Sequence, residues 1–523
     1  MPGRGAGRGV SLAIDAIRKE RFAGVLTTQR GVVALISVLL FTPTLLFATT
    51  LRAPTATILI AGCLGALALV LQPCLSGDAS FLDEPTDFRL LAGLIGFSAF
   101  LLVAGGALHL VYAPSDWRTR DAVLADVSRN WLPFVYDDQS GQYVLRAPLG
   151  MYMAPGLVGH AFGLAAGHVA LWLQNSAMLG AILYVFARLG RGWRHAALML
   201  AFSGCAALGV LIYWLLSDRT LLDHMVRYGM DSWNPYFQYS GSLVQFFWVP
   251  NHALPGWWLA ALMILQARRQ VDLATIGATI GAAMFWSPLA ILPAVAWVAL
   301  QALLSLRDSL TSRRLWALAL AAPCFAPVAA YMVVGAGAIE HGVAATKPMF
   351  AVIYLVFVIA ALAPAAYVLA YHEQLRPELR RPLVFSVVVL LLLPMFSFGP
   401  SNDLVMRGSI PALAILAFCF ADVVLAPQSR AGRAFRAGVA IAILCLPSAL
   451  YELARPTFRA SYDISDCSLF EANAAMGMTG ISANYVAPRS EIPNWLMDLS
   501  AAPSRASQAR ACWSDGGEPP ADR

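Results

Sequence analysis

Long apolar runs alternate with short polar connectors along most of the chain. Most runs are close to twenty residues, the length of a helix that crosses the hydrocarbon core of a bilayer. We count about thirteen of them between residues 31 and 453. They lie at 31–50, 54–75, 90–112, 166–187, 195–216, a segment ending at Arg268, 272–286, 289–306, 315–335, 349–371, 383–399, 409–426 and 437–453. The pattern therefore predicts an all-α, polytopic transmembrane protein.

Composition supports this fold class. The chain is 59% hydrophobic and only 13% charged, with a mean hydropathy of +0.65, far from the average of a soluble globular protein. The net charge of +6 does not indicate a nucleic-acid partner, because the basic residues lie in short clusters between apolar runs. Such clusters are typical of loops that orient membrane helices. The sequence therefore predicts contact with membrane lipids.

The basic clusters also predict an orientation. Residues 1–30 are basic and are expected to be cytoplasmic, with the first apolar run retained because no small-residue cleavage site ends it. Alternating crossings then place three outer loops at 113–165, 217–255 and 399–408. The tail, 454–523, is expected to be extracytoplasmic. Short interfacial helices are expected in the outer loops, and we find no internal repeat and no separate soluble domain.

The first outer loop concentrates acidic residues: Asp116, Asp121, Asp126, Asp137 and Asp138. Charge is costly beside a membrane unless water, a partner or a substrate meets it. Asp116 is the candidate general base that takes a proton from an acceptor hydroxyl, and the alternative is a helix N-cap. Asp121 and Asp126 are candidates to orient a sugar hydroxyl or to hold a divalent cation, and the alternative is a solvated helix face paired with arginine.

Other polar residues on the predicted outer face are candidates for substrate binding. His160 is a candidate ligand for a lipid phosphate, or a hydrogen-bonded interfacial histidine. Asn251 and His252 suit a sugar or pyrophosphate pocket, or belong to an interfacial aromatic belt.

The third outer loop contributes Asn402, Asp403 and Arg407. Arg407 is the best-placed fixed cation for a phosphate, and the alternative is an ion pair with Asp403 one helical turn away. We expect Asp116, His252, Asp403 and Arg407 to converge on one outward-facing pocket.

The eight cysteines do not have the spacing of a zinc site, so no metal ligands are assigned and no cofactor is required, although a divalent cation remains possible. Six cysteines in or near apolar runs are best explained as small packing residues. Cys467 and Cys512 lie in the polar tail, where an oxidising compartment would allow them to form a disulfide.

Two stretches carry a family resemblance: DWRTRDAVLADV, and APLGMYMAPGLVGHAFG after it. With FFWVPNHALPGWW, MFWSPLAILP and SNDLVMRGSIPAL they cover about a quarter of the chain, and in this order they resemble bacterial GT-C-type glycosyltransferases. The chain departs from the pattern of this class in two ways. The acidic loop follows the third predicted helix, whereas in the class it often follows the first. His160 occupies a position at which relatives often have Lys.

The resemblance implies a GT-C-like fold in the bacterial inner membrane, with the active site facing the periplasm or exterior. It implies transfer of a sugar, with inversion, from a polyprenyl-phosphate donor to a glycan, lipid or protein acceptor of the cell envelope. Asp116 matches the position of the catalytic base.

Two other functions stay open. A transporter or flippase of lipid-linked sugars requires ionisable residues near mid-membrane or repeat symmetry with broken helices, and Asp422 is the main candidate within an apolar run. A non-catalytic membrane protein of envelope assembly predicts no enclosed cavity around Asp116.

Overall fold

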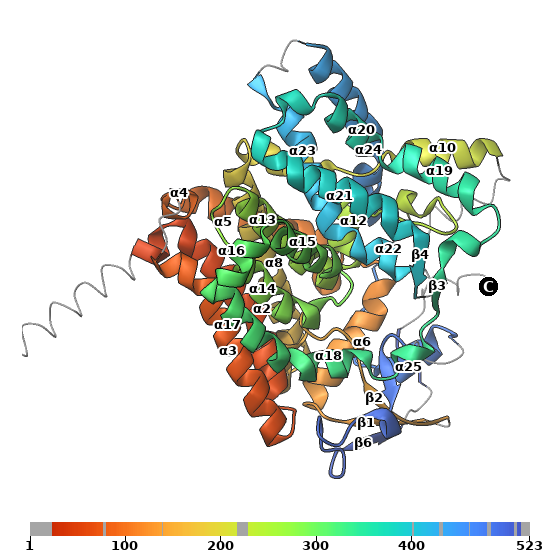
Figure 1. The fold of residues 1–523 in the computed structure, drawn as a ribbon. Helices are drawn as coiled ribbons and strands as arrows, with labels where there is room; N and C mark the ends of the chain where they lie inside the picture. The colour runs from red at the N-terminus through yellow and green to blue at the C-terminus, as the bar shows by residue number, and fades with distance from the viewer. Residues whose placement is uncertain are drawn as a thin grey trace, which may run out of the picture.

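The computed structural model describes residues 24–76, 80–138, 140–216, 229–399, 402–427, 432–459, 461–478, 483–506 and 510–513. The chain is mostly helical, with 72% helix and 5% strand, as the apolar pattern predicts. Figure 1 shows the helices packed side by side, with a small sheet built by β1, β2 and β6 at one end. Most of the predicted N-terminal segment 1–30 and residues 217–228 of the second outer loop lie outside the described residues.

Within the described residues, six helical segments are long and apolar enough to cross a membrane. They are Gln29–Ala48 (α2), Ala53–Pro73 in α3 (Ala53–Ser76), Leu164–Leu189 (α8), Trp193–Ile212 across α9 (Trp193–Ala201) and α10 (Ala206–Leu216), Arg313–Val333 across α17 (Arg313–Ala321) and α18 (Ala326–Val333), and Arg433–Phe458 (α24). A seventh is the pair α19 (Phe350–Ala361) and α20 (Ala363–Ala370), bent by 56°. By length and composition these segments support a membrane protein.

Other predicted crossings correspond to shorter helices. Four apolar helices of 10–17 residues are α5 (Phe88–Ala104), α14 (Leu273–Trp286), α15 (Leu292–Leu304) and α23 (Ile410–Val424). The remaining α-helices are α4 (Ser80–Asp83), α6 (Asp116–Arg129), α7 (Met153–Phe162), α12 (Ser242–Trp248), α13 (Pro250–Ala267), α16 (Leu306–Thr311), α21 (Arg380–Leu392), α22 (Asp403–Gly408) and α25 (Leu469–Ala475). The six or seven long segments are fewer than the thirteen crossings that the sequence predicts, because several runs fold as short or broken helices.

Helix breaks fall where glycine and proline indicate them. Gly163 has a φ of +93°, which favours glycine, and it separates α7 from α8 as predicted. Pro288 lies in the predicted break between α14 and α15. Helix α7 packs directly on α6, because a Cβ added at Gly156 would come within 2.5 Å of Val127. These breaks fix α6 and α7 as a compact layer in the first outer loop.

The tail forms a sheet with the first outer loop, which the all-α prediction did not include. The sheet order is β5-β2-β1-β6, in which β1 (Val135–Asp138) and β2 (Gly141–Leu145) form an antiparallel hairpin. Strand β5 (Val486–Pro488) pairs antiparallel with β2, and β6 (Ser504–Ala506) pairs parallel with β1. A second, two-stranded sheet joins β3 (His341–Val343) to β4 (Phe396–Phe398). The tail is therefore integrated with the outer loops.

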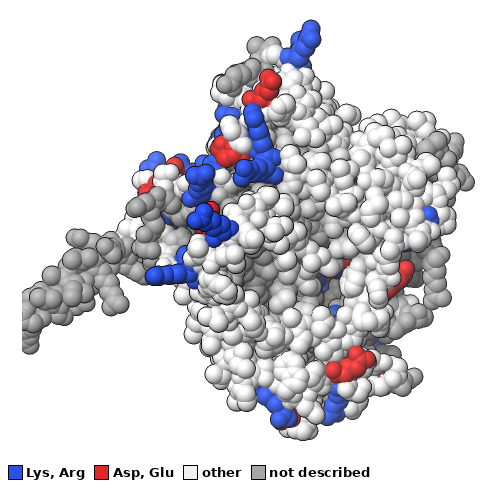
Figure 2. Space-filling model, in the orientation of Figure 1, with Lys and Arg blue, Asp and Glu red and all other residues white. Residues whose placement is uncertain are grey.

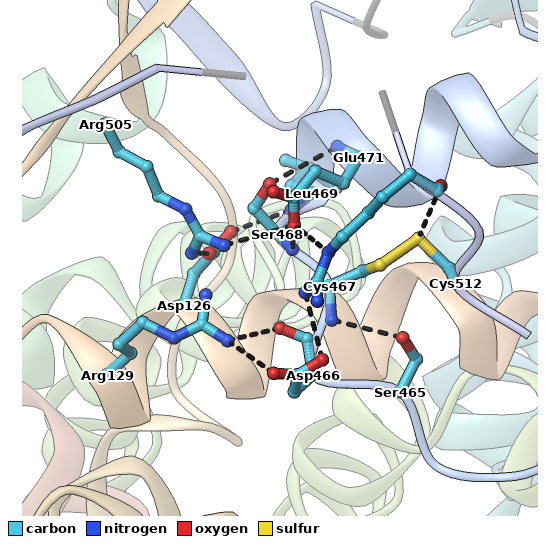
Figure 3. Close-up of a disulfide and its surroundings, with 11 residues drawn as sticks. Asp126, Arg129, Ser465, Asp466, Cys467, Ser468, Leu469, Glu471, Arg505 and Cys512 are labelled. Atoms are coloured by element: carbon cyan, nitrogen blue, oxygen red, sulfur yellow. Dashed lines mark hydrogen bonds and ion pairs between the residues drawn. A yellow bond between two sulfur atoms is a disulfide. The ribbon is translucent and has the colours of Figure 1, made fainter. Parts of the chain in front are cut away.

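Charged contacts hold the tail against α6, as Figure 3 shows. Asp126 is fully buried and lies 2.8 Å from the Nη1 of Arg505, whose Nη2 is 3.1 Å from Glu471. The predicted disulfide between Cys467 and Cys512 is present beside this network. Ion pairs therefore hold the tail against the end of α6, and the disulfide links two segments within the tail.

Charges are unevenly distributed on the surface in Figure 2, where most arginines gather at the upper left and a broad uncharged surface lies below them. Several acids form ion pairs with arginines: Arg30 with Asp83, Arg188 with Glu84, Arg268 with Glu378, Arg314 with Asp272, and Arg376 with Asp422. Asp422 has no exposed surface and lies 2.8 Å from Arg376 and 3.4 Å from Arg191. Asp422 therefore belongs to an ion-pair network at the end of α23.

Candidate functional site

Asp116 occupies the first turn of α6. The N-cap residue is Ser115, and no side chain caps the helix, so the N-cap alternative for Asp116 is wrong. One carboxylate oxygen lies 3.3 Å from the Nη2 of Arg120, and the side chain is 45% exposed. A carboxylate at this end of a helix is stabilised by the helix dipole. Asp116 therefore presents a carboxylate at an accessible position, as a general base requires.

Helix α22 brings a second carboxylate to the same place. Asp403 lies 2.9 Å from Arg407, one turn along the helix, and accepts a hydrogen bond of 3.2 Å from the Asn484 amide. Burial raises the pKa of Asp403, the Arg407 charge lowers it, and the Asp116 charge raises it again. The Asp116 charge acts on the Asp403 carboxyl, so α6 and α22 place the two carboxylates in the same region of the molecule.

Two further side chains, His252 and Tyr485, complete this cluster. His252 at the start of α13 interacts with the charges of Arg120 and Arg407, and its Nδ1 lies 2.6 Å from the Ser287 hydroxyl. Tyr485 of the tail interacts with all four charged groups. We call the set Asp116, Arg120, His252, Asp403, Arg407 and Tyr485 the outer site.

Both arginines of the outer site have unused hydrogen-bond donors. The Nη1 of Arg120 and the Nε of Arg407 are buried and have no hydrogen-bond partner among the described residues. A buried guanidinium donor without a partner is costly, and a phosphate supplies oxygens in the geometry that it prefers. Figure 2 shows a hollow at the lower right, beside α22 in Figure 1, with blue and red atoms inside it and uncharged surface around it. The outer site therefore has the chemistry of an anion-binding site.

Other predicted site residues lie apart from these donors. Asp121 is 2% exposed and faces His109 and His168, not the outer site. Asp126 accepts hydrogen bonds from Tyr136 and from the Leu469 amide, in addition to its pair with Arg505. These contacts correct the interpretation of both aspartates as members of a solvated helix face. Because the Asp126 carboxylate is buried and bound to Tyr136, the Leu469 amide and Arg505, it stabilises the fold, and we do not include it among the substrate ligands.

Three more predicted residues make local contacts. His160 is exposed on α7, with its Nδ1 3.0 Å from the Ser128 carbonyl. Asn251 lies 3.2 Å from the His252 ring and so belongs to the edge of the outer site. Asn402 uses its amide to bind the Tyr236 and Phe396 carbonyls, which fixes the start of α22. Asn402 therefore positions Asp403 without facing a substrate itself.

Sequence analysis missed Arg120, Asn484 and Tyr485 as site residues. In the sequence, arginines of this helix were considered only as ion-pair partners of Asp121 and Asp126. The signal for Arg120 is its spacing of four residues from Asp116, which places both side chains on one face of the helix. Asn484 and Tyr485 carry no sequence signal, because their place depends on the pairing of β5 with β2.

No group of three or more His, Cys, Asp or Glu among the described residues is arranged to hold a metal ion. The divalent cation that the sequence left open therefore has no ready-made site in that part of the chain.

Comparisons with known proteins add no relative. No protein-family model matches the chain, and searches of curated proteins and of solved structures found no match.

Proposed function

We propose that this protein is a membrane glycosyltransferase that moves a sugar from a polyprenyl-phosphate donor to an extracytoplasmic acceptor. One observation supports the proposal most: an accessible carboxylate, Asp116, shares a site with two guanidinium groups that have unused donors, Arg120 and Arg407. A base for a hydroxyl and a site for a phosphate are the two parts that such a transfer requires.

In this mechanism Arg120 and Arg407 bind the phosphate of the donor. The lipid chain enters sideways from the bilayer, through the hollow beside α22 that uncharged surface surrounds. Asp116 takes the proton of the acceptor hydroxyl, whose oxygen attacks C1 of the sugar from the side opposite the phosphate. The bond between C1 and the phosphate oxygen breaks, and the phosphate leaves with the electron pair. The arginines stabilise the charge that develops on it, and the sugar is transferred with inversion.

The proposal includes the finer parts of the sequence prediction. These are a GT-C-like arrangement of about thirteen crossings, a location in the bacterial inner membrane, and a site that faces the periplasm or exterior. The acceptor is a glycan, lipid or protein of the cell envelope. A flippase is less well supported, because Asp422 is neutralised by two arginines.

Donor binding can be tested with purified protein and labelled polyprenyl-phosphate sugars. Arg407→Gln is expected to raise the KM for the donor about 10- to 100-fold, because a charge-assisted hydrogen bond to the phosphate is lost. The matched control is Arg489→Gln, since Arg489 contacts Gln142 and Leu499 on the sheet, outside the outer site. Wild-type protein that cleaves none of the donors, or an unchanged KM in Arg407→Gln, would contradict the proposal.

The acceptor side of the site can be tested at Tyr485. Its hydroxyl has no hydrogen-bond partner among the described residues and lies amid the four charged groups. Tyr485→Phe is expected to raise the KM for the acceptor about three- to tenfold and to leave the KM for the donor unchanged. Tyr143→Phe on β2 is the control, because the Tyr143 hydroxyl meets Ser140 at the exposed hairpin. A rise in donor KM alone would exclude this role.

A further inference from the structure

The segment that leads from α5 to α6, residues 105–115, has an unusual backbone. Two successive non-glycine residues, Leu108 and His109, have φ values of +64° and +53°, and Gly106, two residues before Leu108, has a φ of +109°. Side chains disfavour this left-handed region, so it persists only where surrounding contacts hold it. Because the 105–115 segment ends at Asp116, whatever holds this backbone also sets the position of the carboxylate.

Contacts from three parts of the chain meet at His109. Its Nδ1 lies 2.9 Å from the Tyr462 carbonyl, and its Nε2 lies 2.9 Å from a carboxylate oxygen of Asp121. The Ser461 hydroxyl donates a 2.6 Å hydrogen bond to the His109 carbonyl, and the Tyr462 hydroxyl donates one of 3.0 Å to the Pro114 carbonyl. His109 thus ties the 105–115 segment to both α6 and the tail.

These distances determine where protons must be. A carbonyl oxygen only accepts, so the Nδ1 of His109 carries a proton. The Nε2 faces a carboxylate at 2.9 Å, and two lone pairs at that distance would repel each other. Moreover, neither oxygen of Asp121 has a hydrogen-bond partner among the described residues, and its side chain is only 1% exposed. A buried carboxylate without compensation is strongly destabilising, so a proton lies between His109 and Asp121.

The surroundings of the pair favour this proton. The charged and titratable groups that face it are His168 on α8, 3.9 Å from Asp121, and Asp463 in the tail. The Tyr462 ring packs edge-on against the imidazole. Burial lowers the pKa of His109, but Asp121, the Tyr462 carbonyl and Asp463 raise it further, so the net pKa lies above its usual value. A small pocket with room for about one water lies beside His168.

We propose that His109 is a proton-dependent positioning residue: its protonated contact with Asp121 holds the 105–115 segment, and Asp116 with it, in the active geometry. When the proton leaves, the neutral ring keeps a single N–H and no longer donates to both Asp121 and the Tyr462 carbonyl. One of the two contacts is then lost, the 105–115 segment loosens, and Asp116 moves out of place. The consequence for activity depends on the proposed glycosyl transfer, whereas the structural consequence does not.

Hydrogen exchange of the purified wild-type protein over a pH series tests the structural part. Because folding raises the pKa of His109, the protonated contact is present at low pH. Protection of residues 105–116 and 461–463 from exchange is therefore expected at low pH, and it is lost as pH rises through the pKa of folded His109. In His109→Gln and in Asp121→Asn this pH step is expected to disappear, while α13 and α23 stay protected and report that the protein is folded. His341→Gln is the control, because His341 is exposed and bonds only to the nearby Ile339 carbonyl. A step that persists in His109→Gln would overturn the proposal.

Transfer activity of the same variants tests the catalytic part. The wild-type rate is expected to fall about tenfold per pH unit on the alkaline side, and His109→Lys is expected to shift this limb to higher pH because lysine keeps its proton longer. If the alkaline limb of the pH–rate profile lies at the same pH in the wild type and in His109→Lys, the positioning role of His109 is overturned. Absence of transfer at every pH together with an intact exchange step would instead reject the proposed glycosyl transfer and leave the proton-dependent contact standing.

Discussion

Asp116→Asn is expected to lower the rate of sugar transfer by about 10²- to 10⁴-fold, while the KM for the donor changes little. An amide cannot accept the proton of the acceptor hydroxyl, and the contribution of a positioned general base is of this size. The substitution preserves shape, and it removes only an exposed contact with Arg120 at 3.3 Å, so the fold is expected to be retained. Initial rates with a labelled polyprenyl-phosphate sugar, at saturating donor and acceptor, measure the effect.

A second aspartate in the same outer loop provides the control. Asp137 lies on β1, where its carboxylate accepts hydrogen bonds from Gln142 and Ser504. Asp137→Asn therefore makes the same chemical change outside the outer site and is expected to transfer sugar at the wild-type rate. Equal rates for the Asp116 and Asp137 variants would remove Asp116 from the chemistry.

Arg505→Met is expected to destabilise the packing of the tail on α6 by about 3–5 kcal/mol, because it leaves Asp126 buried without a cation. Burial already raises the pKa of Asp126 to about 6, despite the opposing effects of Tyr136, the Leu469 amide and Arg505. Removing the arginine leaves that carboxylate to be protonated or hydrated. Unfolding by denaturant in detergent, together with hydrogen exchange of residues 461–506, measures the loss.

Two further variants show whether burial is the cause. Arg129→Met breaks the contact with Asp466, whose side chain is 64% exposed, and is expected to cost less than about 1 kcal/mol. The double variant Asp126→Leu with Arg505→Met removes both charges and is expected to recover most of the stability that Arg505→Met loses. If Arg129→Met and Arg505→Met lower the free energy of unfolding equally, the buried Asp126–Arg505 pair stabilises the protein no more than the exposed Arg129–Asp466 pair does.

Features that depend on local sequence were predicted well. The apolar runs, the helix at Asp116, and the breaks at Gly163 and Pro288 follow from residue properties within one helical turn or one run. The convergence of Asp116 and Asp403 on one outward-facing pocket stays a prediction, which depends on alternating crossings that carry both loops to one face. The disulfide followed from the two cysteines in the polar tail.

Features that depend on distant pairing were not predicted. Strands of three to five residues are too short to show an alternating pattern, so the sheet was missed. The burial of Asp121 and Asp126 on an apparently solvated helix face follows from His109 and Arg505, which lie outside that helix. Tyr485 reaches the outer site only because β5 pairs with β2. Contacts between distant parts of the chain decided each case: strand pairing for the sheet and Tyr485, and charge pairing for the two aspartates.

The order of the sheet has a consequence for how the protein is made. Strands β1 and β2 leave the ribosome early, but β5 and β6, which flank them, follow the last long apolar helix, α24. Until then the hairpin has two unpaired edges, and Tyr485 is missing beside Asp116. A nascent chain therefore completes this sheet, and brings Tyr485 to its place, only after α24 has been made.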